Sequence, residues 1–280
     1  MAESPVHMPR LLILGLGYTA ARIAAAVEAK NWTVTGTSRD GRPGTMAFDA
    51  AAPEIGRATH ILSSIPPAGD EDPVLAAYRH TLARSGAWLG YLSSTGVYGD
   101  SGGAWVDESA PVGRGRRSAR AAADAEWLAL GARVFRLPGI YGPGRSALDR
   151  VAAGKAHRID LPDQVFSRVH VDDIVSGVIA GFDAPAGAYN LADDHPCGQN
   201  AVIEAACDLL GLPWPALQTL DEAGLSPMAR GFYAENRRVA NGKAKRVLGW
   251  TPRFTDYAAG LRALSATTSP ASVRTQPSPD

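Results

Sequence analysis

The feature that most constrains this chain is a glycine-rich segment between an apolar run and an alanine-rich run near the N-terminus. Residues 11–14 read LLIL, GLGYTA follows at 15–20, and the run TAARIAAAVEAK (19–30) has helical periodicity. The order strand, G-x-G-x-x-A, helix is typical of a turn that binds a dinucleotide. Gly15 permits the tight turn, Gly17 lets a pyrophosphate approach the backbone, and Ala20 lets the helix pack closely. A tight turn without a ligand would use similar glycines, but the complete order favours dinucleotide binding, with the phosphates at the helix N-terminus.

Short apolar runs alternate with amphipathic segments through the first half of the chain. We expect strands in the runs that begin at residues 11, 32, 60, 88 and 133, and a helix at 119–131 that ends at Gly131. Later segments predict a helix at 169–182, a short strand at 188–193 and a helix that ends at Gly211. The alternation predicts an α/β fold with a Rossmann-like, doubly wound parallel sheet, whose strands are apolar because helices cover both faces.

The organisation of the chain follows from where this alternation starts and stops. We expect a flexible N-terminus at 1–9 and a Rossmann core that binds NAD(P) at 10–145. A smaller C-terminal substrate-binding portion at 146–264 is expected to interleave with the core. Residues 265–280 are rich in Ser, Thr and Pro and lack apolar periodicity, which predicts a disordered tail.

Composition and charge exclude several classes of protein. The 280 residues are 45% hydrophobic and carry a formal net charge of zero, so no global field draws the chain to nucleic acid or to an anionic membrane. No apolar run is long enough to cross a bilayer, and MAESPVHMPR lacks the apolar stretch of a signal peptide. Cys197, Cys207 and His195 have no metal-ligand spacing, so we expect no metal and a reduced, cytoplasmic protein.

The end of the second predicted strand bears on the choice between NADP and NAD. A protein that prefers NAD keeps an acidic residue about 20 residues after the glycines, where it binds the ribose. That offset falls on Ser38, which Arg39 follows, and a hydroxyl with a guanidinium suits a 2′-phosphate. A small shift in alignment would place Asp40 there instead, and Arg39 is otherwise a solvated surface residue. NADP is therefore the favoured cofactor and NAD the alternative.

Three further motifs occur in a fixed order: LSSTGVYGD at 92–100, RLPGIYGPG at 136–144 and HVDD at 170–173. With the glycine motif, they resemble the extended short-chain dehydrogenase/reductase superfamily, the NAD-dependent epimerase/dehydratase group, over about residues 11–264. The resemblance implies a cofactor that lies across the strand ends, and a substrate oxygen that Ser94 hydrogen-bonds with help from Thr95. The predicted cofactor-binding residues are Gly15, Gly17, Tyr18, Thr19, Ala20, Ser38, Arg39, Asp49, Ser63, Ser64, Ile65, Pro66, Pro138, Gly139 and Ile140.

The chain departs from that superfamily at its proton-transfer pair. The superfamily uses a tyrosine whose pKa is lowered by a lysine four residues later, and the pair should fall on the helix near residues 119–127. No tyrosine or lysine occurs between Gly99 and Ile140, and Ser118 and Ala122 occupy the aligned positions. Serine is a far weaker acid than a phenol. The chain is therefore predicted to be an atypical member.

Three groups are candidates for the missing proton donor: Tyr98, Tyr141 and a water molecule. Tyr98 belongs to the LSSTGVYGD motif and usually packs against or lines the substrate pocket. The resemblance places Tyr141 on the nicotinamide side. His170 titrates in a suitable pH range, but a structural role that ties a loop to the core is favoured.

The predicted substrate-binding residues are Arg168, Tyr233 and Arg237. The resemblance places substrate contacts in the C-terminal portion, where arginine forks suit phosphate or carboxylate, although a salt-bridged surface helix would also explain the last two. Arg116, Arg117 and Arg120 form a basic run that could neutralise a cofactor phosphate or bind an anionic substrate, or lie in solvent.

The sequence thus predicts an NADP-dependent oxidoreductase or epimerase-type enzyme that acts on a small hydroxylated or anionic metabolite. Two alternatives remain open. One is a non-catalytic NADP(H)-binding redox sensor, which the missing pair favours. The other is an isomerase or dehydratase with a tightly bound cofactor and no net redox turnover. A homodimer through the long core helices is expected from the resemblance.

Overall fold

The computed structural model describes residues 8–113, 115 and 118–267. Parts of the two predicted flexible ends, residues 1–7 and 268–280, lie outside the described residues, and so do Arg116 and Arg117. No helix in the described ranges combines the length and the apolar character that crossing a membrane requires.

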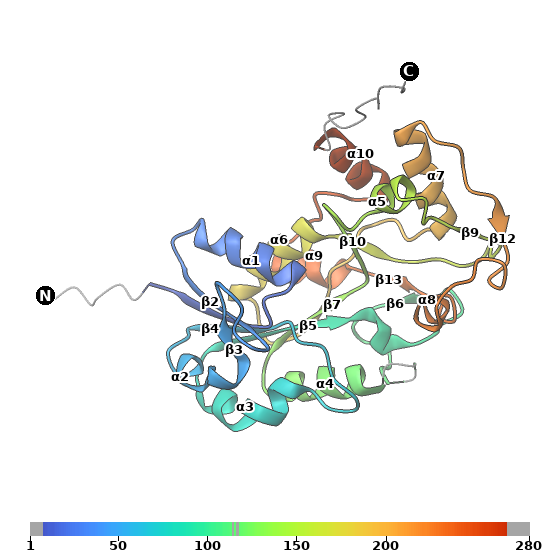
Figure 1. The fold of residues 1–280 in the computed structure, drawn as a ribbon. Helices are drawn as coiled ribbons and strands as arrows, with labels where there is room; N and C mark the ends of the chain where they lie inside the picture. The colour runs from blue at the N-terminus through green and yellow to red at the C-terminus, as the bar shows by residue number, and fades with distance from the viewer. Residues whose placement is uncertain (1–7, 114, 116–117, 268–280) are drawn as a thin grey trace, which may run out of the picture.

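A seven-stranded parallel sheet forms the centre of the molecule, as Figure 1 shows. In spatial order, its strands are β3 (Met46–Ala47), β2 (Thr33–Ser38), β1 (Arg10–Leu14), β4 (His60–Ser63), β5 (Trp88–Ser94), β7 (Arg133–Leu137) and β11 (Gly187–Asn190). Leu12 lies opposite Thr35 of β2 and Ile61 of β4. This order confirms the predicted Rossmann-like fold, and it places the switch point, where such sheets bind ligands, between β1 and β4.

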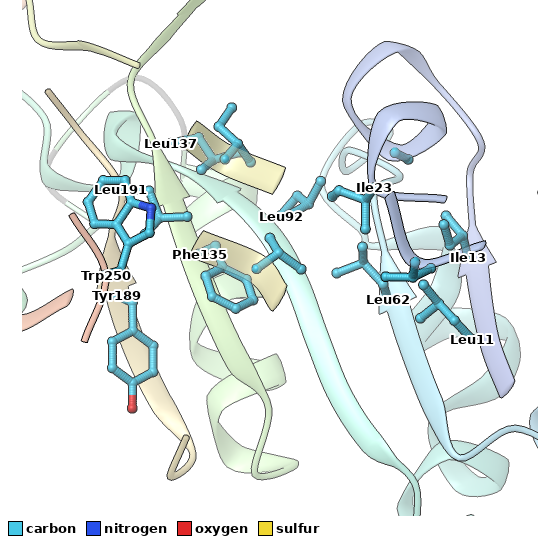
Figure 2. Packing of buried hydrophobic residues seen from close by; sticks show 14 of the residues in the cluster. Leu11, Ile13, Ile23, Leu62, Leu92, Phe135, Leu137, Tyr189, Leu191 and Trp250 are labelled. Carbon is cyan, nitrogen blue, oxygen red and sulfur yellow. The ribbon is translucent and has the colours of Figure 1, made fainter. Parts of the chain in front are cut away.

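Helices cover both faces of the sheet because successive strand residues point to opposite sides. Leu11 and Ile13 of β1 face one cluster of apolar side chains, which Figure 2 shows, and Leu12 and Leu14 face the other. Trp250, predicted to belong to the core, is 3% exposed and lies in the first cluster. The first face is covered by α1 (Tyr18–Glu28), α6 (Val171–Ala180) and α9 (Gly242–Leu248), and the second by α2 (Ala52–Ile55), α3 (Pro73–Arg84) and α4 (Ser118–Ala129).

A buried ion pair fixes α4 to the sheet. Asp124 of α4 is 0% exposed and accepts hydrogen bonds from Arg136 of β7, at 3.0 Å from Nε and 2.7 Å from Nη2. The hydroxyl of Ser93 on β5 donates to the same carboxylate at 2.7 Å. Two strands and one helix therefore share a single buried carboxylate.

Three more helices form a third apolar cluster beyond the carboxyl ends of the strands. It contains Leu148, Ile203 and Leu261, one from each helix. The predicted helix end at Gly211 is confirmed, because Gly211 is the left-handed C-cap of α7 with φ 66°. The helices of this cluster are α5 (Ala147–Ala152), α7 (Gln199–Leu210) and α10 (Tyr257–Thr267), and α8 (Pro227–Phe232) lies nearby in the chain.

Short parallel strand pairs connect this C-terminal part to the core. Pairing between β8 and β10 places Arg168 opposite Gly139 and His170 opposite Tyr141. The segment that follows the sheet therefore lies directly against the 139–141 turn. The paired strands are β8 (Gly139–Tyr141) with β10 (Arg168–His170), β9 (Arg158–Ile159) with β12 (Leu217–Gln218), and β6 (Trp105–Val106) with β13 (Arg238–Val239).

The buried ion pair gives a test of what holds α4 in place. Asp124→Asn leaves the buried Arg136 charge uncompensated and should lower the free energy of unfolding by about 3–5 kcal/mol. Glu126→Gln is a matched control on the same helix, because Glu126 pairs with Arg79 at the exposed surface and should change the value by less than about 1 kcal/mol. Urea unfolding measures both, and equal losses would contradict the assigned role.

Candidate cofactor and substrate cleft

One cleft of about 1110 Å³ runs along the carboxyl ends of the strands. Residues 92–96, at the end of β5 and the start of the 3-10 helix that follows it, line this cleft together with residues 137–141. Of the predicted site residues, the following line the cleft: Gly17, Tyr18, Thr19, Ser64, Pro66, Ser94, Thr95, Pro138, Gly139, Ile140, Tyr141, Arg168, Tyr233 and Arg237. The others do not line it: Gly15, Ala20, Ser38, Arg39, Asp49, Ser63, Ile65 and Tyr98.

The glycine-rich turn opens into this cleft at the start of α1. Gly15 has φ +92°, and a Cβ there would lie 2.6 Å from Cγ1 of Ile65, so these two residues shape the turn from behind. Gly17 is the N-cap of α1, which has no side-chain cap and no acidic residue in its first turn. A Cβ on Gly17 would meet nothing within 4 Å. The free N–H groups of this helix end therefore suit the phosphates of a dinucleotide.

The loop after β2 brings an arginine onto the glycine turn, and it is Arg42 that makes the contact. Nη2 of Arg42 donates to the backbone oxygen of Leu16 at 2.5 Å. The Ser38 hydroxyl stays within its own loop, where it bonds Thr45 Oγ1 at 2.7 Å and accepts from the Arg42 N–H at 2.9 Å. Arg39 is exposed. Sequence reasoning missed Arg42, although the run SRDGR carries two basic residues after the strand.

Two of the predicted cofactor-binding residues, Asp49 and Ser63, do not line the cleft. Asp49 is exposed in the short 3-10 helix Phe48–Ala50, which follows β3. Ser63 is fully buried at the end of β4, and among the described residues its hydroxyl has no hydrogen-bond partner.

Ser94 lies at the carboxyl end of β5 with its hydroxyl hydrogen available to the cleft. Its Oγ accepts from the N–H of Gly96 at 3.1 Å, which caps the 3-10 helix Thr95–Tyr98. Arg120 is the α4 residue that lines the cleft, and it donates to the Tyr91 hydroxyl at 2.9 Å. A guanidinium thus stands on the helix where the superfamily keeps its tyrosine and lysine.

The structure places Tyr98 in the core, which argues against its predicted role as proton donor. Its side chain is 4% exposed, its hydroxyl donates to Asn190 Oδ1 at 2.8 Å and accepts from Nη1 of Arg136 at 3.0 Å. Burial raises the pKa of Tyr98 to about 12, although the Arg136 charge opposes the shift. The phenol therefore belongs to the ion-pair network behind Ser94.

Tyr141 does line the cleft, in a setting that disfavours its ionised form. Its hydroxyl donates to the backbone oxygen of Asp256 at 3.4 Å. Burial raises its pKa, and the negative charges of Asp193 and Asp173 raise it further. The ring of Tyr141 lines the cleft, but its hydroxyl is directed toward Asp256 and Gly260 of the C-terminal segment, so it is a poor proton donor there.

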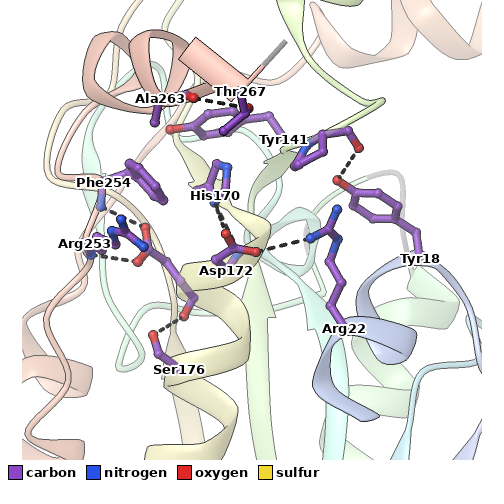
Figure 3. A network of polar contacts seen from close by, with 12 residues as sticks. Tyr18, Arg22, Tyr141, His170, Asp172, Ser176, Arg253, Phe254, Ala263 and Thr267 are labelled. Atoms are coloured by element: carbon purple, nitrogen blue, oxygen red, sulfur yellow. Dashed lines mark hydrogen bonds and ion pairs between the residues drawn. The ribbon is translucent and has the colours of Figure 1, made fainter. Parts of the chain in front are cut away.

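His170 belongs to a polar network that joins distant segments, as Figure 3 shows. Its Nδ1 accepts from the N–H of Asp172 at 3.2 Å, and burial lowers its pKa. Asp172 also receives a hydrogen bond from Arg22 of α1 at 3.4 Å. Tyr18 donates to the backbone oxygen of Pro143 at 3.1 Å. These contacts support the structural role favoured for His170.

Two of the predicted substrate-binding residues, Arg168 and Arg237, donate hydrogen bonds to other groups of the protein. Arg168 donates to the backbone oxygen of Phe166 at 2.9 Å and to Gln199 Oε1 at 3.0 Å. Arg237 donates to the backbone oxygen of Gly99 at 2.6 Å and pairs with Glu235 at 2.9 Å. Both therefore hold the cleft wall in shape as well as contributing charge.

Asp193, which sequence reasoning did not single out, is buried close to this wall. It is 2% exposed, and its Oδ2 has no hydrogen-bond partner in the part of the chain that the structure describes. Burial raises its pKa to about 7, against the opposing charge of Arg168. Folding therefore favours the protonated carboxyl.

The strand order, the glycine turn and the cleft at the switch point define a Rossmann-type fold, with its cleft at the place where such sheets bind ligands. Among solved structures, the human epimerase family protein SDR39U1 with NADPH has a TM-score of 0.72 at 16% identity, over 92% of this chain and 99% of that one. A functionally unknown conserved protein from Silicibacter pomeroyi DSS has a TM-score of 0.85 and 39% identity, over 94% of this chain and 100% of that one. No family model matches the sequence.

A curated relative has a named activity. The 3-diazoavenalumate denitrifying reductase of Streptomyces sp is 31% identical over 205 residues, which cover 66% of this chain and 65% of the relative. The chain belongs to the same family as the Silicibacter protein, and it shares its fold with the human epimerase family protein. It departs from the superfamily that its motifs resemble at α4, which carries neither a tyrosine nor a lysine.

The raised pKa of Asp193 predicts a specific dependence of stability on pH. The pKa rises from 3.8 to about 7 on folding, so stability from the bound proton is present below pH 4 and is lost as pH rises through 7. Asp193→Asn removes this loss and should become more stable than wild type by about 1–3 kcal/mol as pH rises from 5 to 8. Urea unfolding at several pH values measures the difference. A difference that stays constant with pH would contradict the assignment.

Proposed function

We propose that this protein is an NADP(H)-dependent oxidoreductase or epimerase-type enzyme that acts on a small hydroxylated or anionic metabolite. The observation that carries the proposal is the open N-terminus of α1 behind Gly17, in the same cleft as Ser94 and the 138–141 turn. An anion at the helix start and a reacting group near Ser94 can therefore belong to one bound molecule and its substrate.

Two basic residues near the glycine turn support NADP over NAD. Arg42 is anchored to Leu16, and Arg39 is exposed three residues before it. A guanidinium can bind a 2′-phosphate through paired hydrogen bonds, and two guanidinium groups outweigh the single negative charge of Asp40, which is exposed between them. The human neighbour was solved with NADPH, and other neighbours were solved with NAD.

The cleft residues can orient a substrate for hydride transfer, which the nicotinamide would supply when bound. Ser94 can donate its hydroxyl hydrogen to the substrate oxygen, because its Oγ already accepts from Gly96. Thr95 lines the cleft beside it. Of the three candidate proton donors, a water molecule is favoured, since the Tyr98 hydroxyl is held in the core and burial raises the pKa of Tyr141. The reductase named among the relatives is consistent with reduction as the direction of the reaction.

A non-catalytic NADP(H)-binding redox sensor is a second candidate. The observation that favours it is the content of α4, where Arg120 faces the cleft in place of a titrating pair. An isomerase or dehydratase that retains its cofactor would use the same cleft with no net oxidation of NADPH.

Calorimetric titration with NADPH, NADP, NADH and NAD tests the cofactor assignment. The wild type should prefer the phosphorylated pair by about 10-fold or more, since a charge-assisted hydrogen bond contributes about 1.5–3 kcal/mol. Arg42→Ala and Arg39→Ala should each reduce this preference and leave NADH binding nearly unchanged. Arg57→Ala, at an exposed arginine that pairs with Glu54, is the control. Equal affinity of the wild type for NADPH and NADH would contradict the preference.

Turnover separates the enzyme from the sensor. An enzyme should bleach NADPH fluorescence with at least one member of a panel of aldehydes and ketones, and Ser94→Ala should lower that rate by about 10–100-fold while NADPH still binds. A cofactor-retaining isomerase would convert substrate without bleaching. NADPH binding with neither bleaching nor conversion across the panel would favour the sensor.

A further inference from the structure

The half of the cleft beyond the nicotinamide side carries an excess of positive charge. Its acidic side chains are both engaged by the protein: Asp149 accepts from the N–H and the hydroxyl of Ser146, and Glu235 pairs with Arg237. The positively charged side chains that line this half are Arg150, Lys155, Arg168 and Arg237. An anionic ligand would therefore be attracted to this end.

Arg150 differs from Arg168 and Arg237 because its guanidinium makes no hydrogen bond or ion pair with the described part of the protein. Within residues 8–113, 115 and 118–267, the same holds for the ammonium of Lys155. The two belong to one short segment, since the N–H of Lys155 donates to the backbone oxygen of Arg150 at 2.9 Å. Arg145, by contrast, lies over the Tyr18 ring at 5.8 Å.

Arg150 is solvent-accessible in the cleft, yet protein surrounds it. Enclosure lowers the pKa of its guanidinium, although the Tyr233 phenol opposes this and the like charge of Arg168 adds to it. A free guanidinium in such a setting binds an oxyanion more strongly than a fully solvated one, because fewer water molecules compete with the ligand.

Apolar side chains form a wall in the rest of this half of the cleft. Val202, Ile203, Leu225, Phe232 and Leu261 line it, and Phe232 is 50% exposed. Two nearby hydroxyls accept from backbone N–H groups, Ser167 from Val239 at 2.9 Å and Ser226 from Ala229 at 3.2 Å. The apolar side chains give an apolar or aromatic body a surface to pack against.

Tyr233 joins the charged and the apolar parts. Its ring packs edge-on against Phe166 with centroids 5.5 Å apart. Burial raises the pKa of its phenol, and the positive charges of Arg150 and Arg168 oppose that rise. An aromatic ligand could stack beside this pair of rings while its anionic group reaches Arg150.

We infer that the substrate of this cleft is an oxyanion on an apolar or aromatic body. Arg150 and Lys155 bind the anionic group, and the body lies against the apolar wall formed by α7, α8 and α10. The inference rests on the proposed function and deepens it by naming the substrate class. Carboxylates and phosphate esters share the chemistry that the guanidinium recognises.

Calorimetry with defined probes tests this on the intact protein, both saturated with NADP and without cofactor, at constant ionic strength. The probes are benzoate, phenyl phosphate, the neutral isostere benzamide, and acetate. Benzoate or phenyl phosphate should bind at least about 10-fold more tightly than benzamide and acetate. The tighter of the two identifies carboxylate or phosphoryl as the preferred anion.

Variants assign the two parts of the site. Arg150→Gln should weaken the aromatic anions by about 10-fold or more, while Arg246→Gln, at an exposed arginine of α9, should leave them unchanged. Phe232→Ser should weaken benzoate and leave acetate unchanged. Anions that bind no better than benzamide, or full affinity in Arg150→Gln, would overturn the inference. NADP binding is read in the same experiment, so failure of the proposed function would show separately as a cofactor that does not bind.

Discussion

The buried ion pair between Arg136 and Asp124 is the interaction on which the rest of the site depends. It joins β7 to α4 and accepts a hydrogen bond from Ser93 of β5. Arg136 also donates to the hydroxyl of Tyr98, which ends the 3-10 helix that Ser94 caps. Because a lone buried charge is costly, these elements must keep their relative positions. The pair thus holds the floor of the cleft rigid beside Ser94. The Tyr98 hydroxyl is hydrogen-bonded within this network, and for that reason Tyr98 does not line the cleft.

The two halves of the cleft follow from different causes. The cofactor half is a consequence of the Rossmann topology, because the switch point between β1 and β4 sets an uncapped helix end beside Gly17. The substrate half depends on side chains from α5, α7, α8 and α10, packed on a separate apolar cluster. Its excess positive charge favours an anionic ligand, and its apolar wall favours one with an apolar body. The shared fold therefore supports an inference about the cofactor more strongly than an inference about the substrate.

Sequence patterns predicted the sheet well because they report local preferences. The apolar runs became β1, β4, β5 and β7, and Gly211 ended α7. The patterns did not reveal Arg42 on the glycine turn, the pairing of Asp124 with Arg136, or the burial of Asp193. Each of these depends on contacts between segments that only the folded chain brings together. Tyr98 shows the same limit: its motif placed it near the site, and only tertiary packing shows that its hydroxyl points into the core.

A dinucleotide bound in this cleft should contact the glycine turn and the strand ends and leave α4, with its structural ion pair and Arg120, largely untouched. Hydrogen–deuterium exchange with and without NADPH measures this, since protection maps the bound cofactor onto the backbone. NADPH should slow exchange at residues 15–20, 62–66, 92–96 and 137–141, with little change in the interior of α4, which the ion pair already protects. Unchanged exchange at the glycine turn, or protection confined to another surface, would contradict this placement of the cofactor.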